Sequence, residues 1–302
     1  IIVACVSGLS VAELSTLSQN CMLVAGLGSL VQLYPLWKIG AKLPIVMGVS
    51  FTFVTILCFV GATYGYNAVI GAVLVGGLFE GTLGLFAKYW RKIISPVVSA
   101  AVVTSIGFSL LVIGATSFGG GSGVADFGSA KNVLVGTFTL VCVLLFNIFA
   151  KSFWKQLSVL FGLVMGYILS ICLGMVDFSS IMERGIVSLT KLLPFMHEFN
   201  IGAIISVAVI FLVSATETIG DTSAMTISGL DREITERELS GSLACDGFFS
   251  AVSSLFGCMP ITSFSQNVGL IAMTKVVNRF TIMTGAVAMS LCGFFPPLGA
   301  YF

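Results

Sequence analysis

Two carboxylates lie within or directly behind an apolar stretch, and their spacing is suited to chemistry. Residues 201–220 read IGAIISVAVIFLVSATETIG, and Asp221 follows at once. Glu217 and Asp221 are four residues apart, so they share one face of a helix. If the stretch crosses a membrane, a carboxylate costs about 2.5 to 3.5 kcal/mol at its centre and usually marks a substrate or proton path. A merely solvated helix end is disfavoured, because the charged connector begins only at Asp231.

Two further acids have apolar neighbours. Asp246 lies in SLACDGFFSAV, and Glu80 lies in VGGLFEGTLGLFAKYW. We interpret Asp246 as part of the same functional set, whereas Glu80 is close enough to Lys88, about two helical turns away, to pair with it. Burial favours the neutral form of a carboxyl, so Glu217 could bind a proton and couple it to solute binding. A proton that moves down the membrane potential releases about 2.3 kcal/mol per 100 mV.

A polar run, MPITSFSQNVGLIAMT at residues 259–274, interrupts the apolar sequence. Its proline removes a backbone donor and disfavours helix in the residue before it. We expect the hydroxyls of the run to satisfy backbone groups that this break frees. The side-chain amides of Gln266 and Asn267 offer donors and acceptors together. That combination suits a neutral planar solute with alternating C=O and N–H groups.

Metal and covalent chemistry find little support. The eight cysteines are scattered singly without a CxxC pair, and His197 is the single histidine. A zinc site therefore lacks ligands, and neither an HExxH motif nor a histidine for a serine dyad occurs within a span. We expect no enzyme, no metal, no cofactor other than a proton as coupling ion, and no nucleic-acid partner.

Composition places these residues in a membrane protein. Of 302 residues, 57% are hydrophobic and 9% charged, against about 25% charged in soluble domains. A membrane-crossing helix needs about 20 mostly apolar residues. Such stretches are expected at a partial span 1–10 and at 14–36, 66–87, 93–115, 132–150, 157–176, 201–220, 240–257 and 280–302, with shorter, unusual runs at 43–60 and 260–274. Both ends look cut, so we expect a fragment of a longer chain.

The distribution of lysine and arginine supports this set of spans. Cytoplasmic loops retain these residues, and alternate connectors hold eleven of the chain's fourteen. These are Lys38, Lys42, Lys88, Arg91, Lys92, Lys151, Lys155, Arg232, Arg237, Lys275 and Arg279, against Lys131, Arg184 and Lys191 in the intervening connectors. We therefore expect a multi-pass protein of the cell membrane with those five connectors in the cytoplasm.

The two unusual runs resemble each other. LPIVMGVSFTFV at 43–54 and MPITSFSQNVGL at 259–270 each begin with an apolar residue, Pro and Ile, and then become rich in small, hydroxyl or β-branched residues. By the orientation above, the first runs outward and the second inward. Interrupted spans at corresponding positions of two halves indicate the binding site of an inverted-repeat transporter. Non-helical backbone at membrane depth must be buried in protein or line a wet cavity.

In these motifs and their order, the chain resembles the nucleobase/ascorbate transporter family. The run QNVGLIAMTK at 266–275 is similar to that family's signature, a Gln or Glu followed by Asn-x-Gly, four variable residues, Thr and a small or basic residue. SATETIGDTSA at 214–224, the stretch around Asp246, and GVSFTF at 48–53 occur in the family's order and spacing. The resemblance covers essentially the whole chain.

The resemblance implies an all-α polytopic membrane protein with an inverted repeat, seven plus seven spans when intact. Two broken spans, the third and tenth, contain short antiparallel strands followed by half-helices. It further implies a core domain formed by residues 1–92 and 201–302 and a gate domain formed by residues 93–200. Members of the family often form homodimers through the gate domain, so we expect a homodimer in the lipid bilayer.

The resemblance also implies roles for individual residues. Glu217 would bind the ring N–H groups of a nucleobase, and Gln266 would form paired hydrogen bonds with a purine edge. Backbone groups at Phe51 and Ser265 would complete the site, with the Phe51 ring against the base. The supporting residues, for binding geometry and proton coupling, would be Asn267, Asp221 and Asp246.

Glutamine at position 266, where uracil carriers have glutamate, favours an oxidised purine such as xanthine or uric acid, imported by proton symport with alternating access. Lys275 stands where bacterial xanthine carriers have glycine, and the family's first-span histidine would fall before Ile1. A uracil permease of the same family is the nearest alternative. An anion transporter sharing the fold is another, although an acid at the centre of the site counts against it.

Overall fold

The computed structural model describes residues 2–90, 96–121, 126–151, 153–176 and 190–294. Arg91, Lys92 and Arg184 of the charge pattern, and residues 295–302 of the last predicted span, lie outside this part. The chain divides into two compact units, residues 1–106 with 185–302, and residues 107–184. The predicted assignment of core and gate roles to residues 1–92, 93–200 and 201–302 stays a prediction.

The helices of the first unit follow the predicted spans closely. Its elements are α1 (Ile2–Val6), α2 (Val11–Leu33), β1 (Met47–Val49), α3 (Val54–Tyr64), α4 (Tyr66–Leu85), α5 (Ala87–Trp90), α11 (Ile201–Leu230), α12 (Glu236–Leu255), β2 (Ile261–Ser263), α13 (Ser265–Thr274) and α14 (Arg279–Cys292). The helix α6 (Pro96–Phe118) crosses the boundary between the units. Capping boxes begin α2 at Ser10 and α12 at Thr235, as expected for Ser or Thr followed by Glu three residues later.

The two proline-led runs form strands that pair with each other. β1 and β2 are antiparallel, with Met47 opposite Ser263 and Val49 opposite Ile261. Each strand leads into a short helix, β1 into α3 and β2 into α13. The predicted fold class, an all-α membrane protein with two broken spans joined by short antiparallel strands, is confirmed.

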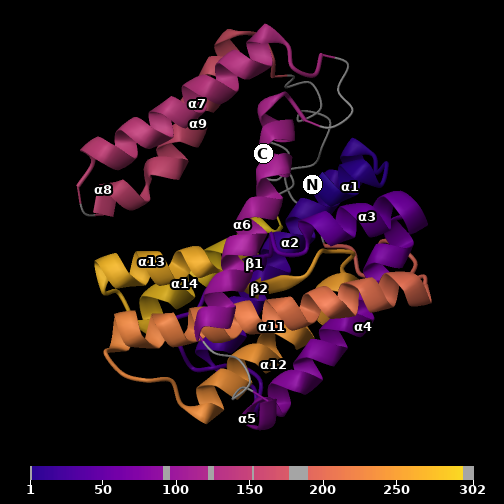
Figure 1. Cartoon of the computed structure of the whole chain (residues 1–302), viewed down its shortest axis with the longest axis vertical. Helices are drawn as coiled ribbons and strands as arrows, with labels where there is room; N and C mark the ends of the chain where they lie inside the picture. The colour runs from indigo at the N-terminus through magenta and orange to yellow at the C-terminus, as the bar shows by residue number, and fades with distance from the viewer. Residues whose placement is uncertain (1, 91–95, 122–125, 152, 177–189, 295–302) are drawn as a thin grey trace. The chain divides into compact units, whose positions relative to one another are not determined.

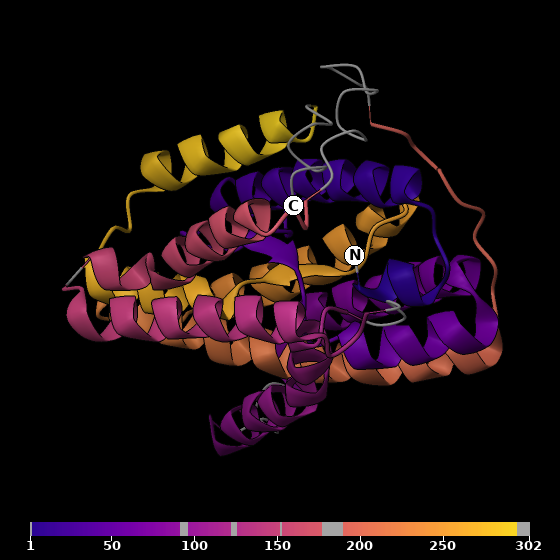
Figure 2. The same cartoon turned by 90° about the horizontal axis from the view of Figure 1, so that it is seen from above.

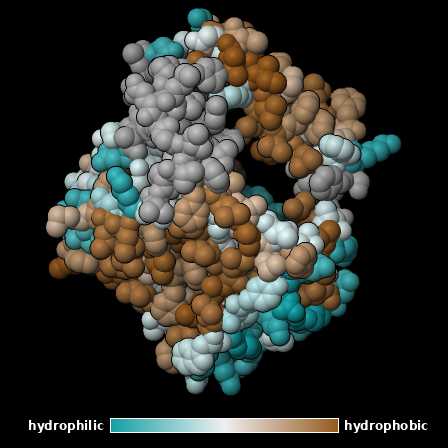
Figure 3. Space-filling view, turned by 180° about the vertical axis from the view of Figure 1, so that it is seen from behind, coloured by the Kyte–Doolittle hydropathy of each residue, from teal (hydrophilic) through white to brown (hydrophobic). Residues whose placement is uncertain are grey.

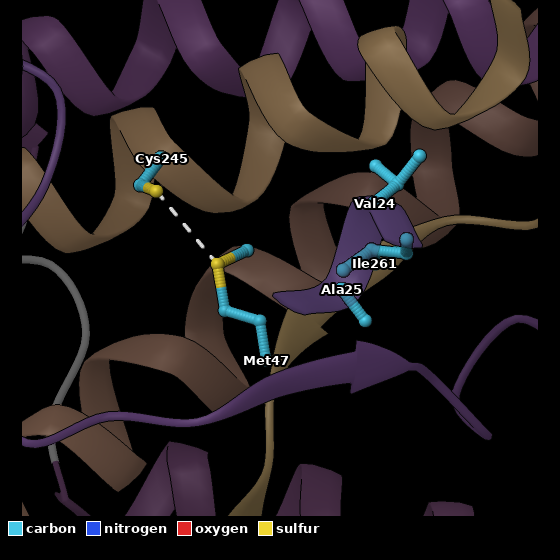
Figure 4. Close-up of a cluster of buried hydrophobic side chains, with 5 residues drawn as sticks. All are labelled: Val24, Ala25, Met47, Cys245 and Ile261. Atoms are coloured by element: carbon cyan, nitrogen blue, oxygen red, sulfur yellow. Dashed lines mark hydrogen bonds between the residues drawn. The ribbon is translucent and has the colours of Figure 1, made fainter. Parts of the chain in front are cut away.

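A hydrophobic cluster lies where the strand pair meets α2 and α12. Figure 4 shows Met47 of β1 and Ile261 of β2 with Val24 and Ala25 of α2 and Cys245 of α12. Cys245 Sγ lies 3.7 Å from Met47 Sδ. Neighbouring helices thus enclose the strands on their sides, as backbone without helical hydrogen bonds requires at membrane depth.

Small residues let α4 approach α12 closely, and α11 lies beside both (Figure 1). A methyl group added at Gly77, Gly84 or Gly247 would come closer than 3.0 Å to backbone atoms of the facing helix. Small residues at such spacing are the usual means by which membrane helices reach backbone contact. On another side of this unit, α14 packs along α2 (Figure 2).

The second unit contains α7 (Ala130–Phe149), α8 (Phe153–Gln156) and α9 (Ser158–Cys172). α7 and α9 pack against each other, with the rings of Phe146 and Phe161 stacked at 4.3 Å between centroids. Gly162 and Gly166 of α9 face Val143 and Thr139 of α7. The pair therefore resembles the first unit in using glycine at a helix contact.

Four helices in the described residues are long and apolar enough to cross a membrane: Glu13–Leu33, Tyr66–Leu85, Ala130–Phe149 and Ile201–Leu230. α11 continues to Leu230, beyond the predicted end at residue 220, so Asp221 is helical. α12 is not among the four, because its charged residues and serines make it less apolar. Broad areas of the face in Figure 3 are hydrophobic, as expected for a protein in lipid.

Candidate functional site

Glu217 of α11 lies between the two broken runs and accepts a hydrogen bond from each. Thr52 Oγ1, just before α3, donates to Glu217 Oε2 at 2.5 Å, and Ser265 Oγ, at the start of α13, lies 3.3 Å from Glu217 Oε1. The glutamate is half-buried. Hydrogen bonds to an ionised acceptor are stronger than neutral ones, so both half-helices are fastened to this carboxylate.

Both half-helices, α3 and α13, begin close to Glu217, and neither has a side-chain cap. The N-cap residues Phe53 of α3 and Phe264 of α13 provide no side-chain hydrogen bond to the first turn. The N-terminus of a helix carries a partial positive charge and exposed N–H groups. Two such ends beside Glu217 can bind carbonyl oxygens while the carboxylate accepts N–H groups.

Asp221 shares a hydrogen-bond donor with Glu217. Ser265 Oγ lies 2.6 Å from Asp221 Oδ2, shorter than its distance to Glu217. One hydroxyl has one proton to donate, so it can serve only one of the two acids at a time. Asp221 also borders a small cavity, whose other lining residues are Ile45, Thr222, Met225, Ser263, Phe264, Asn267 and Val268.

Phe51 and Gln266 are exposed, and each is adjacent in sequence to a residue that bonds Glu217. Phe51 immediately precedes Thr52, and its side chain is 55% exposed. Gln266 follows Ser265 in the first turn of α13, and it makes no side-chain hydrogen bond with the residues that the structure describes. A free amide and an exposed aromatic ring, each adjacent in sequence to a residue that bonds Glu217, have the chemistry to hold a planar polar ring.

Asn267 has a different position from its neighbour Gln266. It is buried, and its Nδ2 donates to Pro44 O at 2.8 Å. The amide thus ties α13 to the start of the first proline-led run. Its predicted part in substrate binding stays a prediction, and the hydrogen bond shows how it can support the geometry of the site.

Asp246 of α12 is fully buried and accepts four hydrogen bonds. Gln32 Nε2 and Ser263 Oγ lie 3.1 and 3.0 Å from Oδ1, and Thr218 Oγ1 and Ser263 N lie 2.8 and 3.0 Å from Oδ2. These donors come from α2, α11 and the end of β2. Four donors can offset much of the loss of hydration of a buried carboxylate. Asp246 of α12 therefore ties α2, α11 and β2 together through its hydrogen bonds.

Sequence reasoning did not single out Gln32, Thr52 and Thr218. Gln32 is fully buried in α2, and it also accepts a hydrogen bond from Ala41 N at 3.0 Å. A buried amide in an apolar span and a threonine in GVSFTF were the available signals. Neither signal names a partner, because each partner lies far away in the chain.

The hydroxyls that satisfy the strands come mainly from neighbouring helices. Ser29 Oγ of α2 accepts from Met47 N, Ser250 Oγ of α12 bonds both backbone groups of Ile261, and Ser253 Oγ of α12 donates to Met259 O. The expectation that the run's own hydroxyls do this is wrong. The hydroxyls of Ser263 and Ser265 instead donate to carboxylates, because an ionised oxygen is a stronger acceptor than a backbone carbonyl.

The structure shows the surroundings of Lys275 and Lys88, two basic residues named in the sequence analysis. Lys275 ends α13 with a left-handed backbone, φ 56°, and its Nζ donates to Ser228 O at 2.6 Å. Glycine adopts this conformation without strain, so the backbone here suits the glycine of related carriers as well. The expected pairing of Glu80 with Lys88 is wrong, since Lys88 is exposed and Glu80 is buried without a hydrogen-bond partner among the described residues.

Within the described residues, no group of three or more His, Cys, Asp or Glu side chains could hold a metal ion. The chemistry available there is that of carboxylates, hydroxyls, amides and helix ends. Such groups bind polar solutes and protons, and the absence of a cofactor stays a prediction.

Comparison with known proteins supplies independent information. A family model described as the Permease family matches residues 1–302. The chain is similar to CPE0397 of Clostridium perfringens, which carries a purine-permease name, with 35% identity over 92% of this chain and 62% of that protein. It is similar to the xanthine permease XanQ of Escherichia coli, with 31% identity over 100% of this chain and 68% of that protein. The uric acid permease PucJ of Bacillus subtilis is 32% identical over 95% and 65%.

A solved structure shares the fold. The transmembrane domain of the cyanobacterial bicarbonate transporter BicA matches with a TM-score of 0.60 and 18% sequence identity, over 99% of this chain and 81% of that one. At this identity the likeness concerns architecture alone. The chain spans about two thirds of the length of the curated relatives it matches, between 62% and 68% for the first two.

Proposed function

Because this chain belongs to the nucleobase/ascorbate transporter family, we propose that it is the greater part of a secondary active transporter that imports a purine such as xanthine or uric acid. The family consists of permeases, so the prediction that the chain is not an enzyme is confirmed, as is its place among multi-pass membrane proteins. The purine and the mechanism below are inferences from the site.

The observation that carries the proposal is the position of Glu217 between two uncapped half-helix ends. An oxidised purine presents ring N–H groups next to carbonyl oxygens. Glu217 accepts N–H groups, while the positive ends of α3 and α13 attract the carbonyls. The free amide of Gln266 supplies a donor and an acceptor for a second edge of the ring.

The shared hydroxyl of Ser265 supports proton symport as the mechanism. When Glu217 is ionised, it competes with Asp221 for that donor. When a proton binds Glu217, the carboxyl needs fewer donors, and the hydroxyl can turn fully to Asp221. Protonation would thereby change how α13 is fastened to α11, which links the proton to the conformational change of alternating access.

The test is uptake of radiolabelled xanthine and uric acid by cells that express the full-length protein. We expect uptake to fall at least tenfold in Glu217→Gln and Gln266→Ala, and to collapse when a protonophore removes the proton gradient. Glu236→Gln is the matched control, because it makes the same change at an exposed glutamate in the first turn of α12. Unchanged uptake in the first two variants contradicts the site assignment.

Two alternatives give different results in the same assay. A uracil permease would show competition by unlabelled uracil but not by xanthine, and Gln266→Glu should then increase uracil uptake. An anion transporter of the same architecture would show flux that is insensitive to the proton gradient. A carboxylate at the site counts against this alternative, because it repels an anion. A homodimer in the bilayer is also proposed, and the mass of the purified protein tests it.

A further inference from the structure

Glu80 is a buried acid that the proposed transport site does not use. It lies in α4, its side chain is 1% exposed, and neither carboxyl oxygen has a hydrogen-bond partner among the described residues. Ser214 of α11 is equally buried, and its hydroxyl also makes no hydrogen bond there. The two side chains adjoin without the geometry of a hydrogen bond. An unpaired ionised carboxylate in such a place would cost far more than a neutral acid.

Close packing around Glu80 leaves little room for a compensating cation. Gly81, the next residue in α4, packs against the Phe248 ring, and its amide faces Gly247 of α12. On the α11 side, the ring of Phe211 lies against Gly76 of α4. A methyl group at Gly76 or Gly247 would come closer than 3.0 Å to these neighbours. The carboxyl is therefore sealed between three helices.

Apart from bases, the titratable groups near the middle of the elements packed against α4 are thiols and acids. They are Asp246 and Cys245 of α12, Glu217 and Asp221 of α11, and Cys58 of α3. An ionised Glu80 would be repelled by the carboxylates of Asp246 and Glu217. The bases of these elements, Lys88 of α5 and Arg237 of α12, have exposed side chains. His197 and Glu198 adjoin only the first turns of α4, near Asn67 and Gly71.

The face of α11 towards α4 and α12 carries a row of hydroxyls at intervals of four residues. Ser214 adjoins Glu80, Thr218 donates to Asp246, and Thr222 Oγ1 lies 3.1 Å from Ser242 Oγ of α12. Residues at this spacing share one face of a helix. Each hydroxyl can accept as well as donate, so Ser214 offers an acceptor oxygen close to Glu80, although the two form no hydrogen bond in this structure.

We propose that Glu80 holds a proton in this conformation and forms a second protonation site, separate from Glu217 at the substrate-facing site. Asp246 satisfies its charge with four donors, whereas Glu80 has none among the described residues and gains neutrality by binding a proton. Loss of that proton would place a further negative charge near Asp246 and Glu217. The neutral acid thus stabilises the contact of α4 with α11 and α12. This inference does not depend on which solute is transported.

Infrared spectroscopy of the purified full-length protein at neutral pH, without substrate, tests the proposal. A protonated carboxyl has a C=O stretching band that an ionised one lacks. We expect Glu80→Gln to remove one such band from the wild-type spectrum, and Glu236→Gln, at an exposed glutamate, to remove none. If Glu80→Gln leaves the protonated-carboxyl bands unchanged, the proposal is overturned. Glu80→Met serves the same comparison if the glutamine variant does not fold.

Thermal unfolding between about pH 5 and pH 8 gives a second readout. In the unfolded chain Glu80 ionises as the pH rises through the ordinary glutamate value of about 4.3, while the folded protein keeps its proton. The melting temperature of the wild type should therefore fall progressively below that of Glu80→Gln as the pH rises. The difference between wild type and Glu236→Gln should stay constant. A constant difference for Glu80→Gln as well would overturn the proposal.

Discussion

Thr52 Oγ1 donates a hydrogen bond to Glu217 Oε2, although the two residues are 165 positions apart in the chain. Thr52 closes the turn before α3, and Glu217 lies in the middle of α11. Ser265 reaches the same carboxylate from the start of α13. One side chain of α11 therefore fixes the starting points of both half-helices, and its protonation state affects both.

Removal of the Thr52 hydroxyl should weaken transport without unfolding the protein. Thr52→Ala deletes a hydrogen bond to a carboxylate, which is worth about 1.5 to 3 kcal/mol, so we expect uptake at low solute concentration to fall about tenfold or more. Thr52→Ser retains the hydroxyl and should restore most of the uptake. Thr63→Ala removes a threonine hydroxyl that bonds only Phe59 O within α3, and it serves as the control. Equal effects of Thr52→Ala and Thr63→Ala would contradict the role of Thr52.

Substitution of Asp246 should affect stability as well as transport. Asp246→Asn replaces one acceptor oxygen by a donor that faces other donors, so we expect a loss of about 3 kcal/mol or more in the free energy of unfolding. Denaturant unfolding in detergent measures it. Asp231→Asn, at an exposed site that has one long ion pair with Lys275, should change stability little. A stable Asp246→Asn protein would show that the four hydrogen bonds contribute less than their number suggests.

The α4–α12 contact should not tolerate a methyl group. Gly247→Ala would bring Cβ closer than 3.0 Å to the backbone of Gly81. The helices must then separate, at a typical cost of about 1 to 3 kcal/mol for overpacking. Gly114→Ala in α6 meets no atom within 4 Å and is the matched control. Melting temperatures of the two variants check the difference, and a Gly247→Ala protein as stable as the control would contradict the close approach.

The start of α12 should loosen in acid. Glu238 lies before the predicted span 240–257, and hydrogen bonds from Arg232, and then from Thr235, lower the pKa of its carboxyl from 4.5 to about 2. Because the pKa is depressed in the folded protein, the carboxylate contributes stability at pH values above its ordinary pKa. This contribution is lost as the pH falls from about 4.5 to about 2. The protection of the Thr235 and Glu238 amides against hydrogen exchange, relative to the intrinsic rate at each pH, should fall across that interval.

Glu236→Gln is the comparison for this pH effect, because Glu236 lies in the same turn without the bond to Arg232. Its exchange rates should follow those of the wild type. Glu238→Gln should show low protection already at neutral pH and no further loss of protection over that interval. Identical profiles for Glu238→Gln and wild type would show that the capping box and ion pair do not hold this turn.

Several features could be predicted from the sequence because they depend on local composition. Apolar length sets the helices, and the proline-led runs at 43–54 and 259–270 indicate the breaks, which the structure resolves as β1 and β2. The order of motifs around Glu217 and Gln266 indicates the family. The limits of these signals are visible in α11, which continues to Leu230, because hydrophobicity alone does not detect a helix that stays buried among polar partners.

The sequence by itself determined the membrane class and the two breaks, and it indicated which acids lie in apolar surroundings, because hydrophobicity and proline act within a few residues of themselves. The tertiary structure alone decided which partner each acid has. Within the described residues, Glu217 accepts hydrogen bonds from Thr52 and Ser265. Asp246 accepts them from Gln32, Thr218 and Ser263, and Glu80 has no hydrogen-bond partner. Hydrogen bonds between residues as far as 214 positions apart depend on how the helices pack, and no local pattern encodes that packing.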